Sequence, residues 1–180
     1  MSSPAFETVA RSLQLKKLAG ELALPSSLKG VNESAFAGGT RDDVSLAPKL
    51  TSLLGLENTK LATVGVAAFK GNMIGGALTF PVTLDSVGAS AFQNNLITKV
   101  SFLNTTVDKI VLGSSCFQNN KIKTNPLTQG VRFGMADYAF ADNSLTGEFS
   151  FEDENVPAPA RGVILGQPGR DEGDHLEVLG

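Results

Sequence analysis

A six-residue motif that ends in phenylalanine recurs five times along this chain, and it constrains the fold more than any other feature. Each copy has an apolar residue five positions before the phenylalanine and a small residue directly before it. The copies read VNESAF, VGVAAF, VGASAF, LGSSCF and MADYAF, and they end at Phe36, Phe69, Phe92, Phe117 and Phe140. Most copies lie about 23 residues apart. A fixed spacing of this size is typical of a repeat architecture, in which each unit is one small supersecondary element.

A short alternating apolar stretch follows each motif, and alternation over three or more residues is typical of a β-strand. The stretches are Leu22–Leu24 before the first motif, then Val44–Leu46, Leu78–Phe80, Val100–Phe102, Val131–Phe133 and Phe149–Phe151. One short strand cannot bury its own apolar side. The sequence therefore predicts stacked units whose strands lie side by side in parallel over a continuous core. The motif phenylalanines are expected to fill the opposite side of that core.

Small and polar residues mark the turns of each unit. The residue directly before each phenylalanine is alanine, except for Cys116. Its small size is expected to let the neighbouring unit approach closely. Asparagine follows four of the five motifs within three positions, at Asn72, Asn94, Asn95, Asn119, Asn120 and Asn143. These residues predict tight turns, because asparagine tolerates left-handed backbone and hydrogen-bonds to backbone groups nearby.

Composition and charge exclude several classes of protein. A net charge of −3 without a basic stripe argues against nucleic-acid binding. The single cysteine excludes an internal disulfide framework and leaves oxidising and reducing compartments both open. The N-terminal sequence is not that of a signal peptide, and no run of about 18 apolar residues predicts a transmembrane helix. We expect a monomer that neither inserts into a membrane nor binds nucleic acid.

Side chains that perform catalysis or hold metals are scarce. The only histidine, His175, lies outside the repeats in a segment rich in glycine and acids, so a Ser-His-Asp or Cys-His site is not expected. Cys116 is expected to be a small buried apolar group. The acids at 152–154 and 171–174 lack the ligand spacing of a calcium loop, and residues 166–173 lack the lysine of a phosphate loop. We therefore predict that the chain is not an enzyme and needs no cofactor or metal.

The repeats also resemble a known family. Three stretches carry the resemblance most clearly, namely LALPSSLKGVNESAF, LTFPVTLDSVGASAFQNNLI and MADYAFADNSLTGEFSF. With the other copies, over roughly residues 13–151, they resemble the BspA-type leucine-rich repeat family. The resemblance implies a right-handed, mainly-β solenoid with a parallel sheet of short strands, one per repeat. The chain departs from the pattern twice: AGGTRDD stands where asparagine is expected after the first motif, and TSLLGLENTK marks extra residues in the second repeat.

The domain organisation follows from where the repeat pattern begins and ends. Residues 1–20 are predicted to be an N-terminal cap, with a short helix as one option. Residues 21–151 hold five to six repeats. Residues 152–180 are acidic and then rich in proline and alanine, which is typical of a linker and tail, although the start of a further domain is an alternative.

The best functional candidate in the sequence is a surface. The residues between the inward positions of the predicted strands are mostly small and polar, and stacked in register they form a flat sheet face. The candidate binding face comprises Ser45, Thr79, Lys99, Ser101, Arg132, Glu148 and Ser150. Solenoids bind partners on such faces. Lys99 and Arg132 are the first residues to mutate, because long basic side chains are unusual among small ones.

The resemblance implies that this surface serves adhesion or interaction, in a surface-exposed or secreted protein of a microbe, and that the ligand is a protein or a glycan. Without a signal peptide in the chain, a cytoplasmic location stays open. Two other functions also stay open. One is an intracellular or host-directed scaffold built on the same repeats, and the other is the targeting repeat of a larger enzyme.

Overall fold

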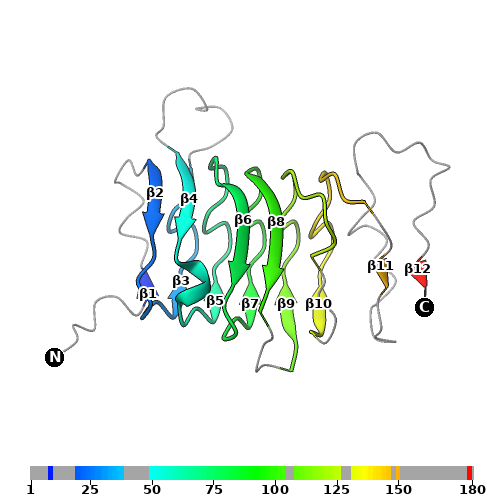
Figure 1. Ribbon diagram of the computed structural model, residues 1–180, viewed down its shortest axis with the longest axis horizontal. Coiled ribbons are helices and arrows are strands. Elements are labelled where there is room, and N and C mark those ends of the chain that lie inside the picture. Colours follow the sequence, from blue (N-terminus) through cyan, green and yellow to red (C-terminus); the bar gives the residue numbers. More distant parts are fainter. Residues whose placement is uncertain are drawn as a thin grey trace.

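The computed structural model is a mainly-β repeat solenoid whose coils lie side by side along one axis (Figure 1). The structure describes residues 19–38, 49–103, 108–126 and 131–146. It also describes the backbone of three two-residue strands, which are β1 (Thr8–Val9), β11 (Phe149–Ser150) and β12 (Val178–Leu179). The rest of the predicted N-terminal cap and of the predicted tail lies outside the described residues. We number coils 1 to 5 by their motif phenylalanines, so that each coil ends with its motif.

One side of the solenoid is a six-stranded parallel sheet with the order β1-β3-β5-β7-β9-β10. After β1 its strands are β3 (Gly30–Val31), β5 (Thr63–Val64), β7 (Ser86–Val87), β9 (Ile110–Leu112) and β10 (Phe133–Met135). Each of these strands ends in the apolar residue that opens a motif. The expected parallel sheet with one strand per repeat is confirmed, but these six strands were not predicted, and the alternating stretches after the motifs pair in parallel elsewhere on the coil. Strands of two or three residues are too short to show a period of two, so alternation could not reveal them.

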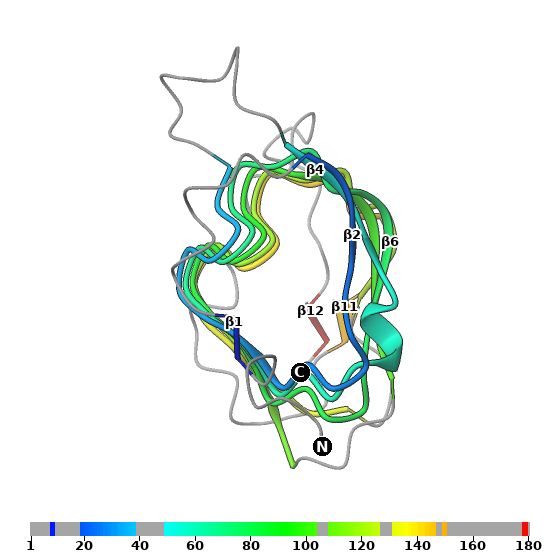
Figure 2. The same cartoon turned by 90° about the vertical axis from the view of Figure 1, so that its left-hand side faces the viewer.

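The alternating stretches form the other side of the coil, as the view along the axis shows (Figure 2). Here β2 (Gly20–Ala23) pairs in parallel with β4 (Leu50–Leu54), and β6 (Gly75–Phe80) pairs with β8 (Leu96–Phe102). β11 pairs in parallel with β12. The predicted strands at Leu22, Leu78, Val100 and Phe149 overlap β2, β6, β8 and β11.

The strand predicted at Val131–Phe133 was placed on the wrong side of the coil. β10 pairs with β9, so Phe133 belongs to the six-stranded sheet. In coil 5 the position opposite β10 is taken by residues 121–126, in which no strand is assigned. A three-residue alternation occurs on both sides of a coil, so the pattern alone does not tell to which side a stretch belongs.

In the second repeat, the structure differs from the prediction in the position of the strand and in the position of the extra residues. The predicted strand Val44–Leu46 lies outside the described residues, and the strand of this coil that pairs with β2 is β4. The stretch TSLLGLENTK was taken as extra sequence, but it supplies most of β4 and the short 3₁₀ helix η4 (Leu56–Asn58). The extra length of this repeat therefore falls before β4.

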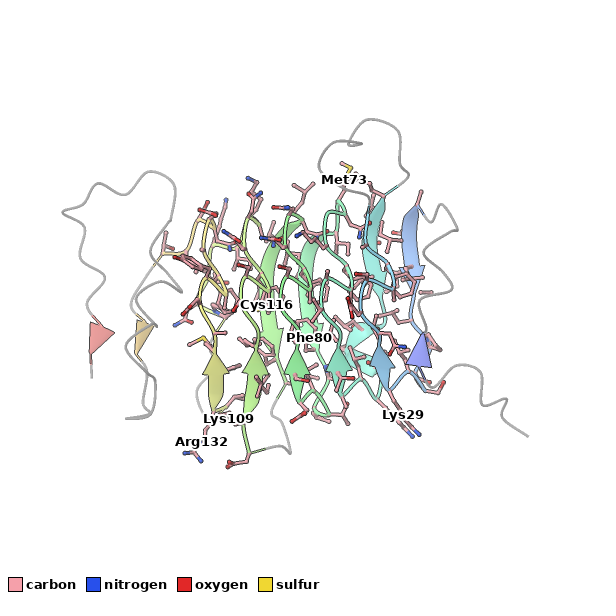
Figure 3. All side chains as sticks on the ribbon, turned by 180° about the vertical axis from the view of Figure 1, so that it is seen from behind. Lys29, Met73, Phe80, Lys109, Cys116 and Arg132 are labelled. Atoms are coloured by element: carbon pink, nitrogen blue, oxygen red, sulfur yellow. The ribbon has the colours of Figure 1, made fainter. Side chains whose placement is uncertain are left out.

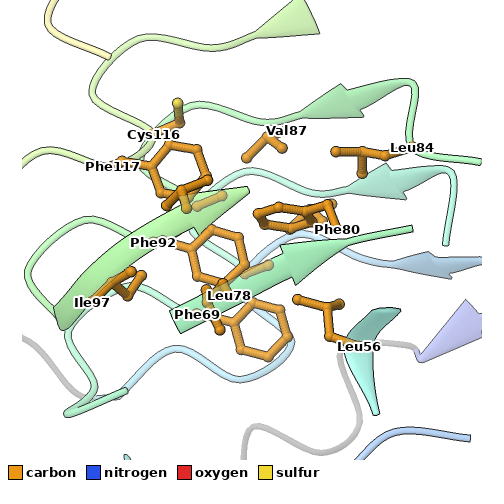
Figure 4. Close-up of a cluster of buried hydrophobic side chains, with 14 of the residues drawn as sticks. Leu56, Phe69, Leu78, Phe80, Leu84, Val87, Phe92, Ile97, Cys116 and Phe117 are labelled. Atoms are coloured by element: carbon orange, nitrogen blue, oxygen red, sulfur yellow. The ribbon is translucent and has the colours of Figure 1, made fainter. Parts of the chain in front are cut away.

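The motif phenylalanines form a continuous stack through the core, as predicted. Rings from successive coils lie nearly parallel, with centroid separations of 5.2 Å for Phe36–Phe69, 5.1 Å for Phe69–Phe92, 5.4 Å for Phe92–Phe117 and 5.2 Å for Phe117–Phe140. Phe80 and Phe102 stack in the same way from the opposite side, and Phe80 meets the Phe92 ring edge-on at 5.7 Å (Figure 4). Stacked and edge-on pairs are both favourable arrangements of aromatic rings. Each coil thus contributes one phenylalanine ring to a ladder of buried rings.

A ladder of buried asparagines joins each coil to the one before it. Asn120 is the clearest case, because its Nδ2 donates to the carbonyl oxygens of Phe92 and Phe117 at 3.0 and 2.9 Å, and its Oδ1 accepts from the Ile97 N–H at 3.1 Å. Asn72, Asn95 and Asn143 make the same three bonds to the equivalent residues of the coils before them. Backbone groups that the turns leave unpaired are therefore satisfied by a side chain.

Left-handed backbone recurs at two fixed places around each motif. The residue two positions before the phenylalanine has a positive φ in every coil, between 52° at Ala67 and 60° at Tyr138. The residue two positions after it does so as well in four coils, including Asn94 and Asn119 at 59° and 53°. The turn role predicted for asparagine is therefore confirmed for Asn94 and Asn119, while Asn95 and Asn120 serve the buried ladder.

Neighbouring coils touch most closely at the residue that follows the first motif position. A Cβ atom built on Gly88 would lie 2.7 Å from the backbone of Gly65 and Val66, and one on Gly113 would lie 2.5 Å from the Ala89 nitrogen. Separations this short do not occur for real Cβ atoms, so a larger residue must push the coils apart. Glycine at this position fixes how tightly the coils stack.

Candidate binding face

The outward side chains of β6 and β8 form a regular face over the core. In the register of this pair Ala77 lies beside Lys99 and Thr79 beside Ser101, while Leu78, Phe80, Val100 and Phe102 point inward. Ala77 and Lys99 are exposed, and Thr79 and Ser101 are half-buried. The structure thus brings together three of the predicted face residues, namely Thr79, Lys99 and Ser101.

Arg132 does not lie on this face. It directly precedes β10, on the six-stranded sheet, and its Nη1 lies 3.2 Å from Oδ1 of Asp108. The side chains of Arg132 and Asp108 are 57% and 87% exposed, and Figure 3 shows Arg132 beside Lys109 at the edge where these strands begin. An ion pair this exposed contributes little to stability.

The remaining predicted face residues lie where side chains are not described. Ser45 and Glu148 are outside the described residues, and Ser150 is placed only through the backbone of β11. The predicted face is therefore defined in coils 3 and 4 alone.

The face continues into coil 5 through two lysines that the sequence reasoning missed. The Lys121 N–H donates to the Ile97 carbonyl at 2.9 Å, and the Lys123 N–H lies 3.4 Å from the Thr98 carbonyl. Ile122 is fully buried between them, so Lys121 and Lys123 both point outward, and both are exposed. Counting positions from each motif phenylalanine would have found them, because they stand four and six residues after Phe117, as Leu96 and Thr98 do after Phe92.

Hydroxyl groups border these lysines on the next segment. The Ser144 N–H bonds to the Ile122 carbonyl at 3.0 Å, and the Thr146 N–H bonds to the Lys123 carbonyl at 3.1 Å. Leu145 is buried, so Ser144 and Thr146 are the outward residues here. The surface from β8 to residue 146 therefore carries lysine and hydroxyl side chains.

The turns near the motifs present a second polar array, but its groups bond mainly to one another. Gln93 Nε2 donates to Gln118 Oε1 at 2.7 Å, and Gln118 Nε2 donates to Asp142 Oδ2 at 2.8 Å. Asn119 Nδ2 likewise donates to Asn94 Oδ1 at 2.8 Å. We assign these amide ladders to the connection between coils.

The described residues offer little for catalysis. Cys116 is fully buried beside Phe117, and desolvation raises the pKa of its thiol far above the usual range, so no thiolate is available as a nucleophile. Within the described ranges no group of three histidine, cysteine or acidic side chains could hold a metal ion. His175 and the acids at 152–154 and 171–174 lie outside the described residues.

Comparison with known families agrees with this architecture. The family described as "BspA type Leucine rich repeat region" matches residues 47–156 with six copies, and this range covers more than half of the chain. This chain belongs to the BspA-type leucine-rich repeat family. No curated protein and no solved structure gave a significant match.

Membership in the BspA-type family bears on function only at a coarse level. Leucine-rich repeats are typically non-enzymatic binding modules, so a role in protein interaction is indicated. Across the part of the chain that the structure describes, none of the helices has the length and apolar character needed to span a bilayer.

Proposed function

We propose that this chain is a non-enzymatic interaction module that binds a protein or glycan ligand through the outward face of β6 and β8. The observation that carries the proposal is the pairing of Thr79 with Ser101 and of Ala77 with Lys99 directly above the stacked phenylalanines. Small outward side chains leave the sheet open to a ligand. The Phe80–Phe102 pair beneath them supports the strands on the inner side.

The physical case rests on preorganisation. The inner residues of both strands are buried, and buried asparagines tie the start of each strand to the neighbouring coil. A face held in this way loses little conformational freedom when a ligand binds, so more of the contact energy is retained as affinity. We also propose that the domain boundaries predicted from the sequence hold and that the chain is a monomer.

Substitutions on the face test this function. We expect the double variant Thr79→Tyr/Ser101→Tyr to weaken ligand binding at least ~10-fold, because two bulky, uncharged side chains would occupy the open surface. The measurement is binding to arrays of purified matrix proteins and glycans, before and after substitution. Thr63→Tyr/Ser86→Tyr is the matched control, because these residues are direct neighbours on the outward side of the six-stranded sheet. If only the control variant lost binding, the assigned face would be wrong.

We further propose that the protein is surface-exposed or secreted and acts in adhesion, which family membership supports. Protease treatment of intact source cells tests the location, with the chain followed by antibody and a cytosolic protein as control. We expect the chain to be degraded while the control survives. Full protection of the chain in intact cells, followed by degradation after lysis, would instead favour an intracellular scaffold.

A further inference from the structure

Three exposed lysines gather on the outward side of coils 4 and 5. Lys99 extends from β8, and Lys121 and Lys123 extend from the neighbouring segment that hydrogen-bonds to β8. Among the described residues none of the three ammonium groups has an ion pair or a hydrogen bond. The only ion pair described nearby joins Arg132 to Asp108, at the edge of the other sheet. The three lysines, which we call the lysine strip, therefore form an uncompensated positive surface.

Strand geometry sets how close these charges lie. Alternate residues on one strand are about 7 Å apart and adjacent strands are about 5 Å apart. Lys121 and Lys123 are alternate residues, and Lys99 lies on the adjacent strand beside Thr98, whose carbonyl faces the Lys123 N–H. The backbone positions of the three lysines thus lie within about 10 Å of one another, which is comparable to the Debye length at physiological salt. The mutual repulsion of the lysines is relieved when an anion binds.

Among the described residues, the outward surroundings of the lysine strip supply hydroxyl donors and no carboxylate. The outward described residues of this surface are Leu96, Thr98, Lys99, Lys121, Lys123, Ser144 and Thr146. Thr98 and Ser144 are exposed, and their backbones are joined by hydrogen bonds to the segment that carries Lys121 and Lys123. Asp142, a described acid two residues before Ser144, accepts a hydrogen bond from Gln118 at 2.8 Å in the turn array. Ammonium and hydroxyl donors together suit sulfate or carboxylate groups.

We propose that the lysine strip binds an acidic polysaccharide, one that carries sulfate or carboxylate groups along an extended chain. The inference rests on the proposed function and names the chemistry of its ligand. A protein partner fits this surface less well, because protein interfaces are enriched in aromatic residues and arginine and depleted in lysine. The seven outward residues include no aromatic residue and no arginine. Stacked coils, by contrast, repeat their donors along one direction, as a linear polymer repeats its anionic groups.

The test uses immobilised heparin as the sulfated probe, with desulfated heparin and neutral dextran beside it, and the full chain as analyte. We expect the wild-type protein to bind heparin and not dextran, and binding to weaken as salt rises. The variant Lys99→Gln/Lys121→Gln/Lys123→Gln is expected to bind about 100-fold more weakly, from roughly five-fold per ammonium group. Lys60→Gln/Lys70→Gln/Lys109→Gln is the matched control. It removes the same three charges, so both variants change the net charge from −3 to −6, but from other parts of the surface.

The outcomes separate this inference from the proposed function. Equal loss in both triple variants would show that heparin binding depends only on the net charge of the protein and would overturn the proposal. Equal binding to heparin and to neutral dextran would overturn it as well, whereas unchanged binding to desulfated heparin would assign the interaction to the carboxylates. Tighter binding to polyglutamate than to heparin would overturn it in favour of an acidic protein segment. If heparin binding fails while the array ligand still depends on Thr79 and Ser101, the lysine strip is wrong and the interaction module stands. Thermal melting of each variant shows whether it is folded. The single variant Lys99→Gln is a milder change, and it is expected to lower heparin affinity about five-fold.

Discussion

Replacing Phe92 by alanine is expected to lower the free energy of unfolding by about 4–5 kcal/mol. Phe92 is fully buried in the middle of the ring ladder and stacks on Phe69 and Phe117 at 5.1 and 5.4 Å. Truncation would open a cavity bordered by those two rings and by Phe80 (Figure 4). The backbones on both sides are held by the asparagine ladder, so the site can collapse only in part.

Equilibrium unfolding in urea measures this loss. Phe92→Leu is expected to cost only about 1–1.5 kcal/mol, because most of the apolar volume is kept. Val111→Ala is the control for removing apolar atoms from a β-strand at the surface, since Val111 is 47% exposed in β9, and it should change stability by about 0.5 kcal/mol or less. A loss below about 1 kcal/mol for Phe92→Ala would contradict the view that the ring ladder carries the core.

Replacing Asn120 by alanine is expected to cost about 3–4 kcal/mol, although a single polar side chain is removed. The change deletes three buried hydrogen bonds and leaves the Ile97 N–H without its described acceptor. The carbonyls of Phe92 and Phe117 keep one donor each, from Asn95 and Asn143. The orphaned N–H is therefore the most costly single consequence, because a buried donor without a partner retains its full desolvation penalty.

Asn119 provides the matched control for this prediction. It is the adjacent asparagine, it is exposed, and its Nδ2 bonds only to the side chain of Asn94. Asn119→Gly keeps the left-handed φ of 53° accessible, so the free energy of unfolding should change by less than about 1 kcal/mol. Urea unfolding of both variants separates the two roles. Similar losses at the two positions would mean that the asparagines act only as turn residues.

Much of the core could be predicted from the residues themselves. The phenylalanine spacing predicted one ring per coil, and the small residue before each ring predicted close approach of the next coil. Hydrogen bonds of 2.8 Å bear this out, because the carbonyls of Ala91, Cys116 and Ala139 accept from the N–H groups of Phe69, Phe92 and Phe117 in the preceding coils. These features depend on the size and polarity of single side chains. They repeat with the chain and can be recognised without knowing which strands pair.

The pairing itself could not be predicted in the same way. The six-stranded sheet arises from strands of two or three residues, whose hydrogen bonds come from adjacent coils and whose length gives no period. Val131–Phe133 shows the consequence, because an alternating stretch fits either side of a coil until its partner strand is known.

The residues of the candidate face also fall into those that the sequence predicted and those that only the structure placed. Thr79, Lys99 and Ser101 could be found from alternation because they lie in two long, in-register strands. Lys121 and Lys123 lie in a segment with no assigned strand, and only the hydrogen bonds from their backbone to Ile97 and Thr98 place them beside Lys99. The sequence alone determined the period, the ring ladder and the inward residues, because these follow from local hydrophobic pattern. Only the tertiary structure decided which strands are neighbours and which charges share a surface, because these depend on hydrogen bonds between coils more than twenty residues apart.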